Sequence, residues 1–406
     1  MEESVLASRT EEIRRENLIR LLLKLFKGDA TRGELKASLR VGTSTLSYLV
    51  AELREQGMVE ERKRLYRVGR PSQVIGLQED AWNVIGIKMG REGVSGVRFN
   101  ARGQKMESFV RPILSHMRSN KGYTEALRDV LLYFKTHERK TPLLGIGVCS
   151  SGTVDSHRGE IVHSPVMNVE HLGVQQIATE IFGEIPILVT NDVDSLGAFE
   201  AFLNPRKDTL LISYGIGIGA SYIHRGRVFH PVRGLSSFEI GHMVVANDGN
   251  CYCGQVGCLE YHASEYAILR RYQGLRESFR DFVEREEELF KDKLLELRKR
   301  ARDPDHRLLR AYEEAFQYLA LVVGNLVVLL KPARVVLFGE GIVGDWMADL
   351  LYKRITERFA PLMVGDFTLE VEHRIRLWEE GAAFAALLKF LPAFVASRRE
   401  KQRGSA

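Results

Sequence analysis

The sequence predicts an α/β protein with a small, mostly helical domain at its amino terminus. Three short helical patterns and a basic extended segment fill the first 78 residues. From residue 79 onward, buried strands alternate with long helical stretches, notably Tyr266–Leu297 and Leu308–Leu330, a pattern typical of α/β lobes. Three of the four cysteines also fall within eight residues, which indicates a metal site rather than disulfides.

Length and composition limit the class of protein. A chain of 406 residues has room for two or three domains, and 45% hydrophobic with 27% charged residues is ordinary for a globular protein. No uninterrupted apolar run approaches the roughly 20 residues that span a bilayer. The start Met1-Glu2-Glu3 is acidic where a signal peptide would be basic. We therefore expect a cytoplasmic protein and exclude membrane-spanning and secreted classes.

Three helices are expected within the first 57 residues. Ser8 with Glu11, and Thr31 with Glu34, form capping boxes that mark the starts of the first two. The third helix is expected to begin near Thr43. It carries apolar residues at i, i+3, i+4 and i+7 that form one buried stripe, namely Leu46, Leu49, Val50 and Leu53.

The opposite face of the third helix indicates nucleic-acid binding. It carries four hydroxyl side chains and one aromatic ring, contributed by Thr43, Ser44, Thr45, Ser47 and Tyr48. Such a face suits a helix whose amino-terminal end enters a major groove. The extended segment that follows is basic and includes Arg62, Lys63 and Arg64. Three helices and a basic hairpin predict a winged helix-turn-helix domain and linker over residues 1–78.

Two further observations bear on this domain. The first 77 residues hold 15 Lys and Arg against 11 Asp and Glu, so four of the five net positive charges lie there. Arg70, within Gly69-Arg70-Pro71-Ser72, is well placed to enter a minor groove. A solvated basic face, a small helical interaction domain and a plain interdomain linker are the alternatives for these features.

The cysteine cluster carries the most specific local signal. His242 precedes Cys251, Cys253 and Cys258 in the spacing H-x8-C-x-C-x4-C. Three thiolates and one imidazole complete a tetrahedral Zn²⁺ site with no position left for water, so a structural zinc ion is predicted. The alternative is a loop of reduced cysteines without metal.

These motifs together resemble the ROK family (repressor, open reading frame, kinase). The resemblance rests on the T-S-T-L-S-Y-L-V-A-E-L helix, the G-R-P-S segment, the E-x-G-H motif and the C-x-C-G-x-x-G-C-x-E motif. It covers nearly the whole chain and implies two actin-like lobes around a cleft, over residues 79–200 and 201–406. The last helix is a candidate to pack back on the first lobe.

The resemblance also implies a sugar site. The matching positions are Gly152, Asn191, Asp192, Glu239, His242 and Glu260. In the family's kinases the aspartate of the N-D pair acts as general base. Outside the segment expected to bind ATP, this chain departs from the family pattern at Tyr48, where many relatives are basic, at Ser151, which replaces a proline, and at Asp194, which replaces an asparagine.

The segment expected to bind ATP argues against kinase activity. ROK kinases place D-x-G-G-T after the first strand, whereas this chain has Lys88-Met89-Gly90-Arg91-Glu92. Lys88 would oppose a metal ion, Arg91 fills the space of a glycine, and Glu92 would repel phosphate. Glu340 adds negative charge in a later glycine turn. We therefore expect no enzyme activity.

The expected function is a sugar-responsive transcriptional repressor of carbohydrate-utilisation genes. Its partners would be double-stranded operator DNA and a sugar or sugar phosphate, and it would act as a homodimer or tetramer. Two alternatives stay open: a ROK-type sugar kinase with a fused DNA-binding domain, and a repressor controlled by a protein partner. The polarity, inducer or co-repressor, is also open.

Overall fold

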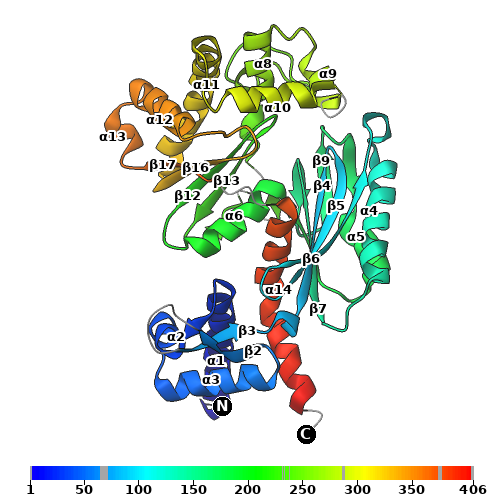
Figure 1. Cartoon of the computed structure of the whole chain (residues 1–406), viewed down its shortest axis with the longest axis vertical. Coiled ribbons are helices and arrows are strands. Elements are labelled where there is room, and N and C mark those ends of the chain that lie inside the picture. Colours follow the sequence, from blue (N-terminus) through cyan, green and yellow to red (C-terminus); the bar gives the residue numbers. More distant parts are fainter. Residues whose placement is uncertain are drawn as a thin grey trace.

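The chain forms an amino-terminal domain and two larger lobes that follow one another along the long axis of the molecule (Figure 1). The computed structural model describes residues 2–64, 72–230, 232, 234–236, 238–285, 289–373 and 377–403. Side chains of residues 2–10, 64, 72, 236 and 399–403 lie outside that description.

The amino-terminal domain contains three helices and one small antiparallel sheet. Its elements are α1 (Glu2–Phe26), β1 (Ala30–Thr31), α2 (Arg32–Leu39), α3 (Thr43–Glu55), β2 (Val59–Arg64) and β3 (Ser72–Leu77), with strand order β1-β3-β2. The capping box of Thr31 and Glu34 is present. The helix start predicted at Ser8 is wrong, because α1 already begins at Glu2. Three helices followed by a β-hairpin make a winged helix-turn-helix.

The first lobe contains a five-stranded sheet in the order β11-β7-β4-β5-β6. Its strands are β4 (Asn83–Gly90), β5 (Gly93–Asn100), β6 (Lys105–Pro112), β7 (Leu143–Ser150) and β11 (Ile187–Asn191). The helices α4 (Asn120–Thr136) and α5 (Val174–Phe182) pack on this lobe, whereas α6 (Asp192–Leu203), which follows β11, packs mainly on the last helix and on the sheet of the second lobe. β4, β7 and β11 run parallel, while β5 and β6 continue the sheet antiparallel. A second, four-stranded sheet joins β8 (Thr153–Asp155), β9 (Glu160–Ser164), β10 (Val169–Leu172) and β15 (Leu235–Ser236).

The second lobe repeats this topology. Its sheet has the order β14-β13-β12-β16-β17, with β12, β16 and β17 parallel and β13 and β14 antiparallel. The strands are β12 (Thr209–Tyr214), β13 (Ile218–His224), β14 (Arg227–Val228), β16 (Arg334–Phe338) and β17 (Thr368–Val371). The helices are α7 (Leu259–Ala263), α8 (Glu265–Gln273), α9 (Phe279–Glu284), α10 (Lys291–Arg300), α11 (His306–Leu330), α12 (Trp346–Arg358) and α13 (Pro361–Val364). Two lobes of one topology give the actin-like arrangement that the resemblance implies.

One predicted helix is divided in the structure. A single helical stretch was expected over Tyr266–Leu297, but α8, α9 and α10 replace it. Gly274 adopts a left-handed conformation (φ 69°) that ends α8, and the Ser278 hydroxyl caps the start of α9. The separate helices pack their apolar faces on the core around α11.

The last helix, α14 (Trp378–Arg403), runs from the region between the lobes to the amino-terminal domain (Figure 1). It packs on β4 and β7, where Gly86 and Gly147 permit close approach. A Cβ atom at Gly86 would lie 1.8 Å from the Glu379 carbonyl oxygen, and one at Gly147 would lie 1.9 Å from that of Ala382. These two glycines therefore fix how closely the helix lies on the sheet.

The far part of α14 joins the core of the amino-terminal domain. Leucines of α1 share one buried cluster with Phe384, Leu387 and Leu391. The rings of Phe26 and Phe384 lie 5.3 Å apart between their centroids. The amino-terminal domain is thus packed against α14 as well as joined to the first lobe through the chain.

Two helices, α11 and the Trp378–Arg398 part of α14, are long and apolar enough to cross a membrane by length and composition. Half of each apolar window is buried inside the molecule. Burial by the chain itself accounts for their apolar character, as in the core helices of globular proteins.

Candidate functional site

A cavity of about 830 Å³ lies between the two lobes. It is lined by residues of both sheets and by the first residues of α14. The residues predicted to bind sugar all line it, namely Gly152, Asn191, Asp192, Glu239, His242 and Glu260. The structure therefore brings together side chains that are up to 108 positions apart in the sequence.

Glu260 is held rigidly at the second-lobe wall of the cavity. It lies in the first turn of α7 and is buried. One carboxylate oxygen accepts a hydrogen bond from the Ile218 backbone N–H (2.6 Å), and the other accepts from the Tyr252 hydroxyl (2.6 Å). Burial, together with the Glu260 carboxylate, raises the pKa of Tyr252 well above its usual range, so this hydroxyl remains a donor. Sequence reasoning missed Tyr252, although it lies between two predicted ligands of the metal.

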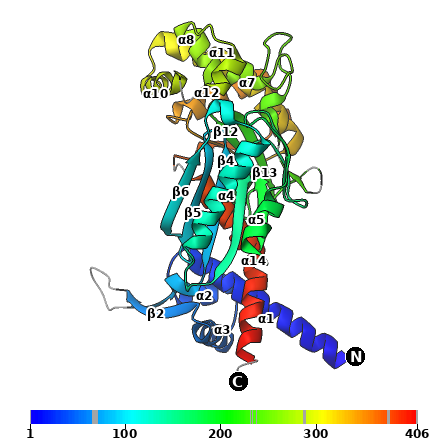
Figure 2. The same cartoon turned by 90° about the vertical axis from the view of Figure 1, so that its right-hand side faces the viewer.

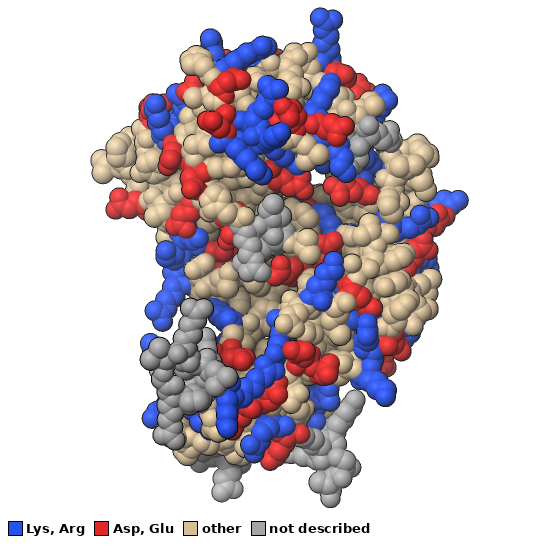
Figure 3. All heavy atoms as spheres, in the orientation of Figure 1, with Lys and Arg blue, Asp and Glu red and all other residues tan. Residues whose placement is uncertain are grey.

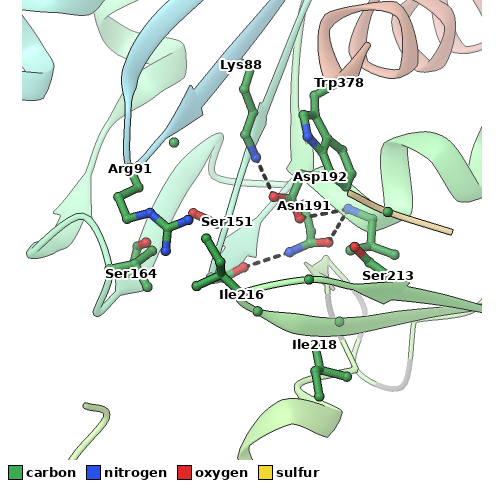
Figure 4. Close-up of a pocket in the computed structure, with 18 of the residues that line it drawn as sticks. Lys88, Arg91, Ser151, Ser164, Asn191, Asp192, Ser213, Ile216, Ile218 and Trp378 are labelled. Atoms are coloured by element: carbon green, nitrogen blue, oxygen red, sulfur yellow. Dashed lines mark hydrogen bonds and ion pairs between the residues drawn. The ribbon is translucent and has the colours of Figure 1, made fainter. Parts of the chain in front are cut away.

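Asn191 connects the cavity wall to the start of α6. Its side-chain oxygen accepts from the Val193 backbone N–H (2.9 Å), and its amide donates to the Gly152 carbonyl oxygen (3.0 Å, Figure 4). Gly152 has φ +89°, and a Cβ there would lie 2.4 Å from the His163 carbonyl oxygen. Only glycine fits this close turn, so its predicted position in the site has a backbone reason.

Asp192 forms an ion pair with Lys88 across the first-lobe wall (Figure 4). Burial lowers the pKa of Lys88, but the Asp192 carboxylate outweighs that effect and holds it above its usual value. The Lys88 ammonium also lies 4.9 Å from the centre of the Trp378 ring. The sequence predicted that Lys88 opposes a metal ion and that Asp192 contacts ligand. It did not predict that the two residues, 104 positions apart, would bond to each other.

A second ion-pair network occupies the glycine turns of the second lobe. Arg298 donates to both oxygens of the buried Glu265 (2.8 Å each) and to Glu340 (2.8 Å). Burial raises the pKa of the Glu265 carboxyl, while hydrogen bonds from Arg298 act against the rise. The Glu265 backbone N–H donates to the Gly215 carbonyl oxygen, which places the network directly beside that turn. Glu340 thus bonds to an arginine of the chain.

Asp194 is buried next to the site in the first turn of α6. The Ser221 hydroxyl donates to one of its oxygens (2.6 Å), and His230 Nδ1 lies 3.5 Å from the other. Burial raises the pKa of Asp194 to about 7, and the nearby Asp192 and Glu239 carboxylates add to the rise. Burial also lowers the pKa of His230, which favours its neutral form.

The His242, Cys251, Cys253 and Cys258 side chains form a group that could hold a metal ion. Their ligand atoms all lie within 4.8 Å of one another. Burial is the main cause that raises the pKa of Cys258 to about 12, so a nearby cation would be needed to keep it as a thiolate. His242 has two ring nitrogens, of which Nδ1 lies 3.8 Å from Cys251 Sγ. Ligation by one nitrogen leaves the other for the cavity.

The predicted DNA-binding face of α3 is exposed. Thr43, Ser44, Thr45, Ser47 and Tyr48 all have exposed side chains. Two cations of α2, which the sequence analysis missed, lie beside them. Lys36 donates to the Thr43 hydroxyl (3.2 Å) and Arg32 to the Ser47 hydroxyl (3.4 Å). The helix-helix packing of α2 on α3, which single-helix patterns do not reveal, brings them there.

The basic wing is partly neutralised by the domain itself. Arg62 pairs with Glu60, and Arg32 pairs with Glu61 (2.6 Å), while Lys63 is exposed. The Arg64 side chain and the whole of Arg70 lie outside the described residues. Figure 3 shows basic and acidic side chains interspersed over the face that it presents. Figure 2 places α3 at the end of the molecule away from the lobes, where DNA could approach.

Comparison with known proteins identifies the relatives. Residues 84–382 match the ROK family model, which is more than half of the chain. The xylose repressor of Bacillus spizizenii is 28% identical over 281 residues, covering 65% of this chain and 71% of the relative.

Two solved structures share the fold. The crystal structure of a ROK family transcriptional regulator, a homologue of the Escherichia coli MLC protein, aligns with TM-score 0.70 and 21% identity over 95% of this chain and 98% of that one. A ROK family glucokinase from Streptomyces griseus, in complex with glucose and AMPPNP, aligns with TM-score 0.57 and 18% identity over 75% and 98%. The regulator alignment extends over the amino-terminal domain, whereas the kinase alignment covers three quarters of the chain.

Proposed function

The chain belongs to the ROK family, and we propose that it is a sugar-responsive, DNA-binding transcriptional repressor of carbohydrate-utilisation genes. One observation carries this proposal: α14 begins at the wall of the cavity and ends in the core of a winged helix-turn-helix domain. A kinase without a DNA-binding domain would not need a last helix whose carboxyl-terminal half packs into such a domain. In this proposal, residues 1–78 form the DNA-binding domain and linker, and residues 79–200 and 201–406 form the two lobes.

The sugar would bind at the second-lobe wall and the start of α6. A hexose or pentose presents neighbouring hydroxyl donors, and carboxylate oxygens accept them in pairs. Glu239 and Glu260 supply such acceptors, and His242 supplies a ring nitrogen. The side-chain oxygen of Asn191 caps α6, so Asn191 would offer its remaining amide hydrogen to a sugar oxygen, and Gly152 leaves room for close approach. Asp192 lines the same cavity and would contact the ligand while it remains paired with Lys88.

Zinc is the metal that this donor set suits best. A tetrahedral Zn²⁺ holds sulfur at about 2.3 Å, so neighbouring sulfurs lie about 3.8 Å apart. Cys253 and Cys258 have Sγ atoms 3.7 Å apart, close to that value. The ion would fix the loop that carries Tyr252 and leads into Glu260, and its role would be structural.

Charged pairs on both walls of the cavity argue against phosphoryl transfer. A general base must be free to accept a proton from the attacking hydroxyl, and Asp192 is bonded to Lys88. The Arg298 network places two carboxylates where nucleotide phosphates would approach the glycine turn. Both features disfavour ATP, and we propose that the chain is not an enzyme.

Binding of operator DNA would use α3 and the wing. The amino-terminal half of α3 would meet base edges and phosphates with Thr43, Ser44, Thr45, Ser47 and Tyr48. Arg62, Lys63, Arg64 and Arg70 would contact the backbone and minor groove, with Lys36 and Arg32 beside them. Two such domains in a homodimer would read a palindromic operator in the cytoplasm.

The effect of sugar binding would be transmitted to the DNA-binding domain through α14. A ligand that favours one closure of the lobes changes the environment of Trp378 and Glu379, which line the cavity. By linkage, a sugar that weakens operator binding must itself bind more weakly to the DNA complex. The second candidate function is a repressor in which a protein partner, and not a sugar, controls α14.

The experiment is capture of genomic DNA fragments by the full-length protein at one fixed salt concentration, followed by a panel of sugars. We expect selective fragments that one class of sugar releases. Glu239→Ala should keep fragment affinity and lower sugar affinity at least tenfold, since it removes a carboxylate acceptor. Glu125→Ala, an exposed change on α4, is the matched control. An unchanged sugar response in Glu239→Ala contradicts the assigned site, and failure to select any fragments contradicts the repressor.

A further inference from the structure

The amino-terminal domain is held to the first lobe by Arg102. This residue lies in the turn between β5 and β6, and its guanidinium donates two hydrogen bonds to the Leu77 carbonyl oxygen (2.8 Å and 2.6 Å). It also pairs with Glu60 of β2 (3.1 Å). In the same turn, a Cβ atom at Gly103 would lie 3.0 Å from Phe26 Cζ, so the end of α1 passes close to this turn. These contacts give the domain a fixed point on the first lobe.

A separate contact holds the same domain to α6. Lys27, which follows the last residue of α1, donates from Nζ to the Phe202 carbonyl oxygen (2.9 Å). Its ammonium also lies 4.3 Å from the centre of the Phe202 ring. The Phe202 carbonyl belongs to the last turn of α6, where carbonyl oxygens lack partners within the helix and a cation is favourable. Lys27 therefore attaches the end of α1 to the carboxyl-terminal end of α6.

α6 is attached in turn to the second lobe. Its Glu200 pairs with Arg334 of β16 (2.6 Å). Apolar residues of α6 share a buried cluster with strands of the second-lobe sheet, namely Leu196 and Ala201 with Leu211, Ile223 and Val336. The other end of α6 begins at Asp192, which lines the cavity. α6 therefore lies between the second lobe and the amino-terminal domain (Figure 1).

The amino-terminal domain thus contacts the two lobes through different residues. Arg102 belongs to the first lobe, whereas Lys27 reaches the second lobe through α6. A rotation of one lobe against the other moves these two contacts relative to each other, because each is fixed to its own lobe. The domain must then turn, or one of the contacts must break.

The packing at this junction leaves room for such a turn. Four phenylalanine rings from α1, α6 and α14 meet there with centroids between 4.5 and 6.4 Å apart, namely Phe26, Phe199, Phe202 and Phe384. A small cavity of about 20 Å³ lies against three of these rings, those of Phe26, Phe199 and Phe384. Close-packed interiors contain few such voids. Ring contacts carry no fixed hydrogen bond, so this junction can repack when the lobes move.

We propose that Lys27 and Arg102 are the two anchors through which closure of the lobes turns the DNA-binding domain, with Lys27 transmitting the movement of the second lobe. This inference rests on the proposed sugar-responsive function and adds a second connection to that through α14. A sugar that draws the lobes together shifts α6 against Arg102 and thereby reorients the domain. Lys27 is a positioning residue, since it belongs to neither the proposed sugar site nor the exposed face of α3.

The test compares operator binding with and without sugar, on the full-length protein at one fixed salt concentration. Fluorescence anisotropy of a genomic fragment selected by capture gives both affinities, with xylose, glucose, galactose, mannose and N-acetylglucosamine as separate probes. Lys27→Met should reduce the sugar-induced change in operator affinity at least about fivefold, because α6 no longer holds α1. Lys27→Arg should keep the response, since a guanidinium can also donate to the Phe202 carbonyl oxygen and lie over its ring.

Lys24→Met is the matched control. It removes the same charge one turn earlier in α1 and should keep the full sugar response. Both methionine variants should keep the melting temperature of the wild type within a few degrees, because each changes a side chain that solvent reaches. Hydrogen exchange of the amides at the end of α1 should become faster in Lys27→Met alone.

The outcomes separate this proposal from the proposed function. If a sugar changes operator binding by the wild type and by Lys27→Met to the same extent, the anchor is wrong and the sugar-responsive function stands. An equal loss of response in Lys24→Met also overturns the anchor, because charge alone would then explain the effect. If no sugar changes operator binding by the wild type, both the anchor and the sugar-responsive function fail.

Discussion

The two walls of the cavity differ in their chemistry. The second-lobe wall presents acceptors, with Glu239 and Glu260 beside the His242 and cysteine group, while the first-lobe wall presents the cations Lys88 and Arg91. The acceptor wall keeps the family's motifs, and the cationic wall replaces the family's D-x-G-G-T segment. The proposed sugar acceptors Glu239 and Glu260 lie on other elements than the segment Lys88–Glu92 that replaces D-x-G-G-T, so the proposed recognition can be retained while that segment changes.

The largest expected effect comes from breaking the acceptor wall. Cys253→Ser removes one of the four proposed metal ligands and should release the metal, because the three remaining ligands would hold zinc far more weakly. We expect metal content to fall from about one ion per chain to near zero and the melting temperature of the lobe to drop by about 5 °C or more. Elemental analysis and thermal unfolding measure these quantities.

Cys149 supplies the control for that change. It is the one cysteine of the chain outside the metal group, and it is buried beneath Trp378. Cys149→Ser should keep a full complement of metal even if it alters stability. Equal metal content in all three proteins would show that the four residues do not form the site.

A smaller effect is expected on the cationic wall. Lys88→Met leaves the Asp192 carboxylate largely buried without its cation, which should destabilise the protein by about 3 kcal/mol. Adding Asp192→Asn should recover much of this loss, because the double variant has no unpaired charge. Unfolding of the single and double variants in urea provides the measurement. If Lys88→Met were as stable as the wild type, the Lys88–Asp192 pair would contribute nothing to the free energy of unfolding.

The smallest effect concerns Asp194, which lies between the two walls. Its pKa is raised to about 7 in the folded protein, so the fold favours the protonated carboxyl and loses stability as pH rises toward 7. Between pH 5.5 and 8 this loss is about 2 kcal/mol. Asp194→Asn should remove that dependence, making the variant relatively more stable at pH 8 than at pH 5.5. A melting-temperature difference between variant and wild type that does not change with pH would contradict this assignment.

Local spacing predicted the parts of the site that are contiguous in sequence. The His242 and cysteine group, the capping box at Thr31 and the exposed face of α3 follow from spacing alone, because each is formed within one loop or helix. The two-lobed fold came from the family resemblance.

Contacts between distant segments were not predictable in this way. The Lys88–Asp192 and Arg298–Glu265 pairs join residues from different elements, and only tertiary packing decides which charges meet. The division of the predicted helix over 266–297 has a similar cause. Gly274 and Ser278 are weak signals of a helix boundary in a sequence. They end α8 and begin α9 because the chain must wrap the core of the second lobe.

The length of α14 has a mechanical consequence. At 1.5 Å per residue, its segment from Trp378 to Leu391 is about 20 Å long, and Pro392 falls only after that segment. With its first turn held at the cavity, a tilt of about 5° would swing the far end through about 2 Å by the geometry of a lever. Phe384 and Leu391 share the buried cluster of the α1 leucines along that segment, so in the proposed mechanism a small angular change at the cavity would become a larger displacement of the amino-terminal domain.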